Sequence, residues 1–347
     1  MRQSLRKHGG LRDKAWMTAT AFGVGTAMLL SACGGTAEED ESAPAEAGAE
    51  PEAEGSEPIE VEDNFGTHTL TPPLESVVAT DNRTFHTLDD WGVELSAAAV
   101  SLMPPGLSYV EDSSITDLGS HREPDLEAVV AAEPDLIING QRFAQYKEDF
   151  EKLAPEAVIL ELDPRDGEDY ADELIRQTEV LGEVFGHEDE AAELVSEFED
   201  SIERAKDAYD SSETVMGVIT SGGSINYSAP GSGRALGPIF DVLDLTPALE
   251  VDQSSTDHQG DDISVEAIAD SNPDWVLVMD RDAALGENSG EEYTPANELI
   301  AESAALQNVT AVTEEQIVYM PQYTYLDEGI QTYTEFFNSF ADALESK

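Results

Sequence analysis

Two stretches of the chain repeat one pattern: residues 126–142 read LEAVVAAEPDLIINGQR, and residues 265–281 read VEAIADSNPDWVLVMDR. In both, a glutamate lies seven residues before a Pro-Asp pair, and an arginine lies eight residues after the proline. The pattern predicts a short amphipathic helix that ends before the proline, and then a largely apolar strand of the kind buried in a parallel sheet. Ligands of open α/β sheets bind beyond the carboxyl ends of the strands. We therefore expect Arg142 and Arg281 to face one crevice from two similar lobes.

Strands and helices alternate on either side of both repeats. In the first half, hydrophobic patterns predict strands at residues 67–71, 77–79, 93–100 and 157–160. They predict helices at residues 84–92 and 169–185. In the second half we expect, in chain order, a strand at 215–219, a loop at 221–233, a helix at 235–243, a strand at 317–320 and a helix at 328–344. Such alternation is typical of doubly wound parallel sheets.

One long helix connects the two halves in this prediction. Residues 188–209 contain neither proline nor glycine, and at ~1.5 Å per residue such a helix is long enough to cross between two lobes. The predicted fold class is α/β, with two Rossmann-like lobes, each around a central parallel sheet, joined by one long α-helix. The lobes are expected at residues 66–186 and 211–347, and the bridging helix at residues 187–210.

The N-terminus has the features of a secretory signal. Basic residues precede an apolar stretch at residues 15–30, and Ser31-Ala32-Cys33 follows. The segment resembles a lipoprotein signal peptide of residues 1–32, in which Cys33 is the acylated first residue of the mature chain. Cys33 is the single cysteine, at the position where acylation needs a thiol. The alternative is an ordinary signal peptide with an incidental cysteine. With acylation, we expect a membrane-tethered protein at the cell surface or in the periplasm.

An acidic segment follows the signal. Residues 33–65 are rich in Glu, Ala, Gly, Pro and Ser, which predicts a disordered linker because such a segment buries too little apolar surface to fold. The whole chain has 74 acidic and 17 basic residues, with a formal net charge of −57. This balance argues against nucleic acid as a partner. It is also consistent with a salt-rich or acidic habitat, and we expect a monomer.

Several motifs together identify a family. They are residues 123–127 (EPDLE), 134–138 (PDLII), 233–235 (GRA), 263–266 (ISVE) and 272–284 (NPDWVLVMDRDAA). From about residue 66 to 344 the chain resembles the substrate-binding lipoproteins of bacterial ABC importers for iron-siderophores, in the class with a single bridging helix, the class III periplasmic-binding-protein fold. The last motif is most similar to the branch that binds catecholate and mixed catecholate-carboxylate siderophores.

This resemblance implies a ligand site built on arginines. In that branch, arginines after the two repeat strands and in the Gly-Arg segment surround the ligand, and here they correspond to Arg142, Arg281 and Arg234. A guanidinium keeps its charge at any relevant pH and offers planar donors that reach several ligand oxygens and stack on aromatic rings. The alternative for each arginine is an ion pair with a neighbouring carboxylate, such as Asp280 or Asp282 for Arg281.

The resemblance also implies direct donors to iron. In some members of the branch, a histidine and a tyrosine complete the coordination when the ligand supplies four donors, and we assign these roles to His258 and Tyr325, with Tyr323 as the substitute. The family pattern has Asp-Pro and Trp before the tyrosine, whereas residues 320–325 here read MPQYTY, so the choice of tyrosine is open. The alternative interpretation of His258 is a solvated histidine in a loop. Tyr227 is expected to stack on the ligand or to form a lid contact.

Glutamates at the two repeat helices suggest a second role. In the family, one acidic residue per lobe docks on the membrane permease, and the matching positions are Glu127 and Glu266, with Glu123 nearby. We expect them at the sheet ends remote from the arginines. Stabilisation of the helix dipole alone, typically ~0.3–1 kcal/mol, would also explain a glutamate in each first turn.

The leading functional prediction is a non-catalytic protein that captures a ferric siderophore in the cleft between the lobes and delivers it to the permease of an ABC importer. It has no cofactor of its own, and the ferric iron is carried as the siderophore complex. One alternative is a haem- or cobalamin-binding protein of the same fold. A secreted hydrolase is a weaker alternative, because the sequence lacks a Gly-x-Ser-x-Gly elbow, a His-Glu-x-x-His helix and a phosphate-binding loop.

Overall fold

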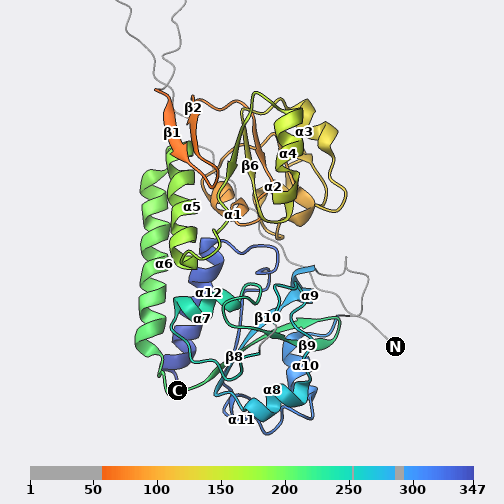
Figure 1. Ribbon diagram of the computed structural model, residues 1–347, viewed down its shortest axis with the longest axis vertical. Helices are drawn as coiled ribbons and strands as arrows, with labels where there is room; N and C mark the ends of the chain where they lie inside the picture. The colour runs from red at the N-terminus through yellow and green to blue at the C-terminus, as the bar shows by residue number, and fades with distance from the viewer. Residues whose placement is uncertain (1–56, 252–253, 286–292) are drawn as a thin grey trace, which may run out of the picture. The chain divides into compact units, whose positions relative to one another are not determined.

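The computed structural model describes residues 57–251, 254–285 and 293–347 (Figure 1). The predicted signal peptide, Cys33 and most of the predicted linker lie outside these residues. The linker was expected to extend to residue 65, but strand β1 (Ile59–Glu62) already pairs antiparallel with β2 (Thr67–Leu70). Val61 and Leu70 are each 2% exposed and belong to the hydrophobic core of the first lobe. Burial of these two side chains places the start of the folded part before residue 65.

The first lobe is a five-stranded parallel sheet in the order β5-β4-β3-β6-β7. Its strands are β3 (Val77–Ala79), β4 (Ala97–Ala98), β5 (Thr116–Asp117), β6 (Leu136–Asn139) and β7 (Val158–Glu161), and its helices are α1 (Phe85–Asp90), α2 (Ser108–Glu111), α3 (Leu126–Ala132) and α4 (Lys147–Leu153). The strand predicted at 93–100 is reduced to the two residues of β4. The Val93 amide is held by the Leu88 carbonyl, and a 3₁₀ turn, η1, begins at Val100 (Val100–Leu102).

The second lobe is a four-stranded sheet in the order β11-β10-β8-β9. Its strands are β8 (Val215–Ser221), β9 (Ser224–Ser228), β10 (Trp275–Asp280) and β11 (Ile317–Tyr319), and its helices are α7 (Gly237–Val242), α8 (Val265–Ser271), α9 (Arg281–Leu285), α10 (Ala296–Glu302), α11 (Thr310–Thr313) and α12 (Ile330–Glu345). The prediction of a loop at 221–233 was wrong at its start, because β9 runs antiparallel to β8. Gly222 and Gly223, with φ of 57° and 75°, form the two-residue turn that joins them.

Both repeats fold as predicted, as a short helix followed by a buried strand. Helix α3 has Asp125 as its N-cap and α8 has Ser264, and both end on a left-handed residue directly before the proline. The aspartate of each Pro-Asp pair then binds the start of a neighbouring strand. Asp135 accepts from the amides of residues 75 and 76 before β3, and Asp274 accepts from the amide of residue 214 before β8. The pair therefore sets the register of a parallel sheet in each lobe.

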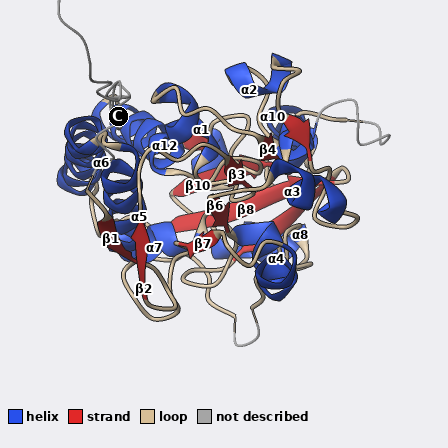
Figure 2. Cartoon of the chain, turned by 90° about the horizontal axis from the view of Figure 1, so that it is seen from above, coloured by secondary structure: helices blue, strands red, loops and turns tan. Residues whose placement is uncertain are grey.

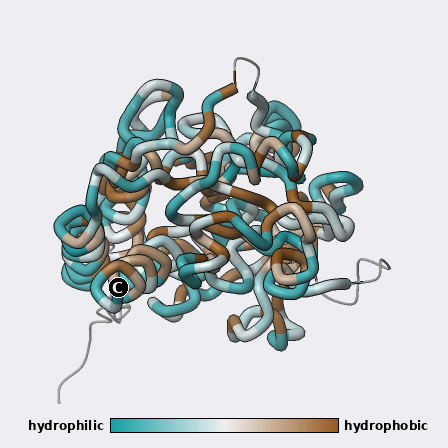
Figure 3. The backbone as a smooth tube through the Cα atoms, turned by 90° about the horizontal axis from the view of Figure 1, so that it is seen from below, coloured by the Kyte–Doolittle hydropathy of each residue, from teal (hydrophilic) through white to brown (hydrophobic). Residues whose placement is uncertain are grey.

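One long helix connects the lobes, as the sequence predicted, and a second helix lies along it. Helix α6 (Glu188–Ala208) is the expected bridging helix, and it packs along α5 (Tyr170–Phe185) and α12 (Figures 1 and 2). Helix α5 contributes to both hydrophobic cores: Leu174 belongs to the core of the second lobe, whereas Leu181 and Val184 belong to the core of the first. Figure 3 shows hydrophobic segments gathered toward the middle of the molecule in this view, with hydrophilic segments around them. Helix α5 therefore packs against both lobes.

A buried carboxylate on α5 should make the stability of the fold sensitive to acid. Burial alone would raise the pKa of Glu173, but hydrogen bonds from Arg165 and Arg176 lower it to about 2. Its ordinary value is ~4.3, so its contribution is complete above that pH and is lost as pH falls toward 2. Glu173→Gln should therefore lower the free energy of unfolding by ~1–3 kcal/mol at pH 7.

The measurement is denaturant unfolding of both proteins between pH 7 and pH 3. The difference between wild type and Glu173→Gln should shrink at the acid end of this range. The matched control is Glu179→Gln, an exposed glutamate on the same helix. A difference that stays constant with pH, or one of equal size for the control, would contradict the assignment.

Candidate ligand-binding site

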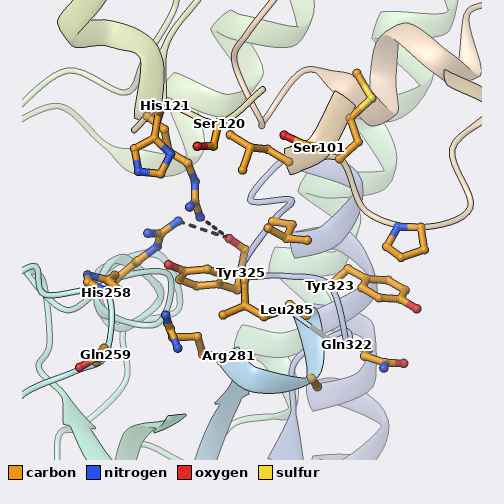
Figure 4. Close-up of a pocket in the computed structure, with 18 of the residues that line it drawn as sticks. Ser101, Ser120, His121, His258, Gln259, Arg281, Leu285, Gln322, Tyr323 and Tyr325 are labelled. Carbon is orange, nitrogen blue, oxygen red and sulfur yellow. Dashed lines mark hydrogen bonds between the residues drawn. The ribbon is translucent and has the colours of Figure 1, made fainter. Parts of the chain in front are cut away.

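A cavity of about 910 Å³ lies between the two lobes (Figure 4). Four arginines and two histidines line it: from the first lobe His121, Arg122 and Arg142, and from the second Arg234, His258 and Arg281. The remaining wall includes small polar and apolar side chains, among them Ser101, Ser120, Leu285 and Leu326. In a chain with a net charge of −57, this concentration of cationic groups defines a site for an anion.

The arginines reach the cavity from the positions that the repeats predicted. Arg142 lies in the 3₁₀ segment η2 (Gln141–Tyr146) directly after β6, and Arg281 opens α9 directly after β10. Arg234 lies between β9 and α7, in the predicted Gly-Arg segment. Because the carboxyl edges of both sheets face the cavity, residues far apart in the sequence come together there.

Tyr325 is the centre of this arginine cluster. The Cζ atoms of Arg142, Arg234 and Arg281 lie 4.7, 4.5 and 5.0 Å from the centroid of its ring. Its backbone carbonyl also accepts hydrogen bonds from Arg142 Nη2 at 2.8 Å and Arg234 Nη2 at 3.4 Å. Burial alone would raise the pKa of the Tyr325 phenol, but the charges of the three arginines bring it below its ordinary value.

Two of the three arginines form ion pairs with carboxylates, the alternative role that the sequence left open. Arg234 Nε donates to Glu328 Oε1 at 2.7 Å, and Arg281 Nη1 donates to Asp282 Oδ1 at 3.0 Å and to Ser221 Oγ at 3.1 Å. Arg142 forms no ion pair with any described residue. The Nε atoms of Arg142 and Arg281 are buried without a hydrogen-bond partner. The cluster therefore keeps unused donors and excess positive charge for a ligand.

The turn that carries Tyr325 is fixed against the first lobe. Asn82 Nδ2 donates to the carbonyl of Leu326 at 2.9 Å, and His86 Nδ1 lies 3.2 Å from Asp327 Oδ2. Gly329 approaches the carbonyl of Arg83 so closely that an added Cβ would lie 2.5 Å from it. Contacts across the lobes thus hold Tyr325 where arginines from both sides can reach it.

Two further predicted residues line the cavity. His258 comes from the loop before α8, and burial together with the nearby arginines lowers the pKa of its imidazole, despite the opposing effect of Asp257. Tyr323 lines the cavity from the same turn as Tyr325 but is less buried. In Figure 4, His258 and Tyr323 lie on opposite sides of Tyr325.

The placement of Tyr227 in the ligand site was wrong. Tyr227 is 1% exposed and belongs to a hydrophobic core cluster behind the sheet of the second lobe. Its hydroxyl donates to the carbonyl of Leu249, and its backbone pairs with Val218 on β8 and with Asp261. The residue sits on β9, in the part of the segment that was predicted as a loop, and so its side chain packs inward.

The glutamates proposed for docking lie elsewhere than expected. Glu123, Glu127 and Glu266 are exposed, but the helices α3 and α8 run antiparallel to the strands that follow them, so their first turns point to the carboxyl edges of the sheets. The far end of α3 confirms this, because the Ala132 carbonyl accepts from Ser76, directly before β3. The glutamates therefore flank the arginine side of each lobe instead of the remote end.

His121 and Arg122 line the cavity but were not among the predicted site residues. Both lie in the connection between β5 and α3, a region that carried no recognised motif of its own apart from the Glu-Pro-Asp sequence that follows. Burial, Arg142 and the other nearby cations lower the pKa of the His121 imidazole. The sequence did contain a hint of their role. They follow a short strand, and any basic residue after a strand is notable in a chain with few basic side chains.

The described residues hold no ready-made metal centre and no membrane span. No group of three His, Cys, Asp or Glu side chains within residues 57–251, 254–285 and 293–347 is arranged to hold a metal ion. In the same residues, no helix has the length and apolar character needed to cross a membrane.

Two α/β lobes that enclose a cationic cavity, with a helical connection between them, define the class of two-lobed solute-binding proteins. A family model described as periplasmic binding protein matches residues 77–324. The chain belongs to this family, which confirms the resemblance seen in the sequence. The family and the relatives below are binding proteins.

The petrobactin-binding protein YclQ of Bacillus subtilis is 28% identical over 328 residues, covering 92% of this chain and 96% of YclQ. Its crystal structure has a TM-score of 0.70 and covers 84% of this chain and all of that one. The ferric-anguibactin-binding protein FatB of Vibrio anguillarum is 29% identical over 255 residues, covering 72% of this chain and 78% of FatB. The periplasmic catecholate-siderophore binding protein VctP of Vibrio cholerae shares the fold, with a TM-score of 0.71, 22% identity and coverage of 84% and 100%.

The arginine cluster should make Tyr325 ionise unusually early. In a spectrophotometric pH titration, a phenolate signal should appear below pH ~10, the ordinary tyrosine value, because three guanidiniums stabilise the charged form. Tyr325→Phe should abolish this first phase, whereas Tyr227→Phe should leave it unchanged, since burial raises the pKa of Tyr227 to about 12. Retention of the early phase in Tyr325→Phe would show that the cluster does not act on this phenol.

Proposed function

We propose that the chain captures a ferric siderophore of the catecholate or mixed catecholate-carboxylate kind and delivers it to an ABC importer. The observation that supports this most strongly is the cluster of Arg142, Arg234 and Arg281 around the buried ring of Tyr325. Ferric catecholate complexes are bulky anions with aromatic rings, and they need both positive charge and aromatic surface. Relatives named for petrobactin and anguibactin binding point to the same ligand class.

The charge of the cavity favours this ligand over haem or cobalamin. Glu328 and Asp282 compensate two arginines, and Arg142 and Arg122 remain uncompensated within the described residues. A corrinoid does not have the anionic charge that would use these groups. Fluorescence titration with ferric catecholates, haem and cobalamin separates these candidates, and preferential binding of either macrocycle would contradict the proposal.

His258 and Tyr325 are the proposed donors to iron when the siderophore leaves coordination positions free. Imidazole nitrogen and phenolate oxygen both suit ferric iron, and His258 and Tyr325 line the same cavity. Tyr325 is favoured over Tyr323 because three arginines surround its ring and stabilise its phenolate. Ferric iron is cargo in this proposal, carried with its siderophore.

Attachment to the membrane and delivery to the permease complete the proposal. Acylation of Cys33 would tether the folded part through the segment that follows, and the protein would work outside the cytoplasmic membrane as a monomer. Glu127 and Glu266 are proposed to dock on the permease, with Glu123 beside Glu127. All three are exposed, and the first turns of α3 and α8 point to the carboxyl edges of the sheets, which suits docking of that side of each lobe on the transporter.

Removal of Arg142 should weaken ligand binding with little damage to the fold. No described carboxylate pairs with Arg142, so Arg142→Ala leaves no buried acid unpaired. The expected loss is that of a charged hydrogen-bond set, ~1.5–3 kcal/mol, or roughly 10- to 100-fold in the dissociation constant of a ferric bis-catecholate. Tryptophan fluorescence quenching measures it.

The matched control is Arg204→Ala, which removes the same charge from α6, where Arg204 pairs with Asp342 and Glu345. Its dissociation constant should stay at the wild-type value. An equal loss in both variants would mean that net charge, and not this cavity, governs binding. An unchanged constant in Arg142→Ala would remove the residue from the site.

Reversal of the two docking charges should separate delivery from capture. Glu127→Lys with Glu266→Lys should reduce uptake of iron-siderophore by cells, because in the family the docking glutamates meet arginines of the permease, and lysines would repel them. Ligand affinity should change by less than about twofold, since exposed charges are screened at physiological salt. The control pair is Glu197→Lys with Glu302→Lys, two exposed glutamates on α6 and α10. Normal uptake in the first double variant would refute the docking role.

A further inference from the structure

His121 is placed firmly at the wall of the cavity. Its backbone carbonyl accepts a hydrogen bond from Tyr146 Oη at 2.6 Å. The Tyr146 ring packs between Phe143 and Phe150, with ring centroids 5.8 and 6.5 Å away. The Leu118 amide, at the start of the same connection, binds the carbonyl of Ala98 on β4. The first lobe thus fixes this segment through both its core and its sheet.

His121 and His258 line one cavity from opposite lobes. Figure 4 shows His121 above and His258 below, on the same side of Tyr325. The residues come from equivalent places, since each lies in the connection that leads into a repeat helix, α3 or α8. A ligand that fills this side of the cavity would contact both imidazoles.

The histidines of the cavity differ from the other described histidines in their partners. Elsewhere a carboxylate lies close by: His68 is 3.0 Å from Asp63, His86 is 3.2 Å from Asp327, and His187 is 3.5 Å from Glu190. His121 has no such neighbour among the described residues, although the chain has 74 acidic residues, and its Nδ1 is buried without a hydrogen-bond partner. The nearest carboxylate contact of His258 is at 3.9 Å. Neither ring is therefore held by a close carboxylate contact, and both line the cavity.

We propose that His121 is a third protein donor to the bound ferric ion, contributed by the first lobe opposite His258 and Tyr325. Imidazole is a suitable ligand for iron, and octahedral ferric iron with three protein donors accepts a chelator that supplies three of its own. Each nitrogen that binds displaces one iron-bound water. This inference rests on the proposed function and narrows its ligand class, from anionic ferric complexes in general to those that leave positions free.

Coordination from both lobes has a mechanical consequence. His258 and Tyr325 belong to the second lobe and His121 to the first, so an iron ion bound to all three links the lobes directly. A hexadentate complex has no free position and would be held by the arginines alone. The contribution of His121 should therefore grow as the chelator supplies fewer donors.

The test compares His121→Ala with wild type for three ferric complexes: iminodiacetate, which is tridentate, a linear bis-catecholate, which is tetradentate, and a tripodal tris-catecholate, which is hexadentate. The dissociation constant should rise at least ~10-fold for the tridentate complex, on the scale known for metal-site substitutions. It should rise less for the tetradentate complex and stay within about twofold for the hexadentate one. The control is His187→Ala, a histidine paired with Glu190 on α6.

Added free imidazole should restore binding of the tridentate complex to His121→Ala, which a purely structural role would not allow. Pulsed electron paramagnetic resonance should detect two coordinated imidazoles in wild type and one in the variant. Equal losses for all three complexes, or an unchanged imidazole signal, would overturn the role of His121 while capture of ferric siderophores stands. Failure of wild type to bind any of the three complexes would overturn the proposed function and this inference together.

Discussion

The site depends on one constraint, the fixed position of Tyr325 between the two lobes. Its turn belongs to the second lobe, but Asn82 and His86 hold it from the first. Guanidiniums from both lobes lie within 5.0 Å of its ring centroid, and each cation over an aromatic face is worth ~0.5–2 kcal/mol. Without this platform, the mutual repulsion of buried arginines would drive them apart.

The electrostatics of the cavity follow from the same arrangement. Glu328 and Asp282 neutralise part of the cluster, which keeps the empty protein stable, whereas the excess charge is left for the ligand. The chain as a whole is strongly acidic, with a net charge of −57, whereas four arginines line the cavity. This contrast favours an anionic ligand in the cavity and disfavours anions on the acidic remainder of the chain.

The repeats made much of this predictable. The hydrophobic period and the Pro-Asp pair predict a helix followed by a buried strand in each repeat. The spacing to the arginine places that residue at the end of the strand, so Arg142 and Arg281 were expected to face the same crevice. The errors arise where tertiary packing decides. A glycine turn converts part of a polar segment into β9, which buries Tyr227, and the direction of α3 puts Glu127 on the arginine side. His121 was missed because its role depends on the opposite lobe and not on its own neighbours in the sequence.

The most direct test of the account is a crystal structure of the chain with a ferric bis-catecholate. We predict that the catecholate oxygens lie within hydrogen-bonding distance of Arg142, Arg234 and Arg281, with the complex beside the ring of Tyr325. A complex bound outside this cavity, or one in the cavity that contacts none of these three arginines, would contradict the central claim.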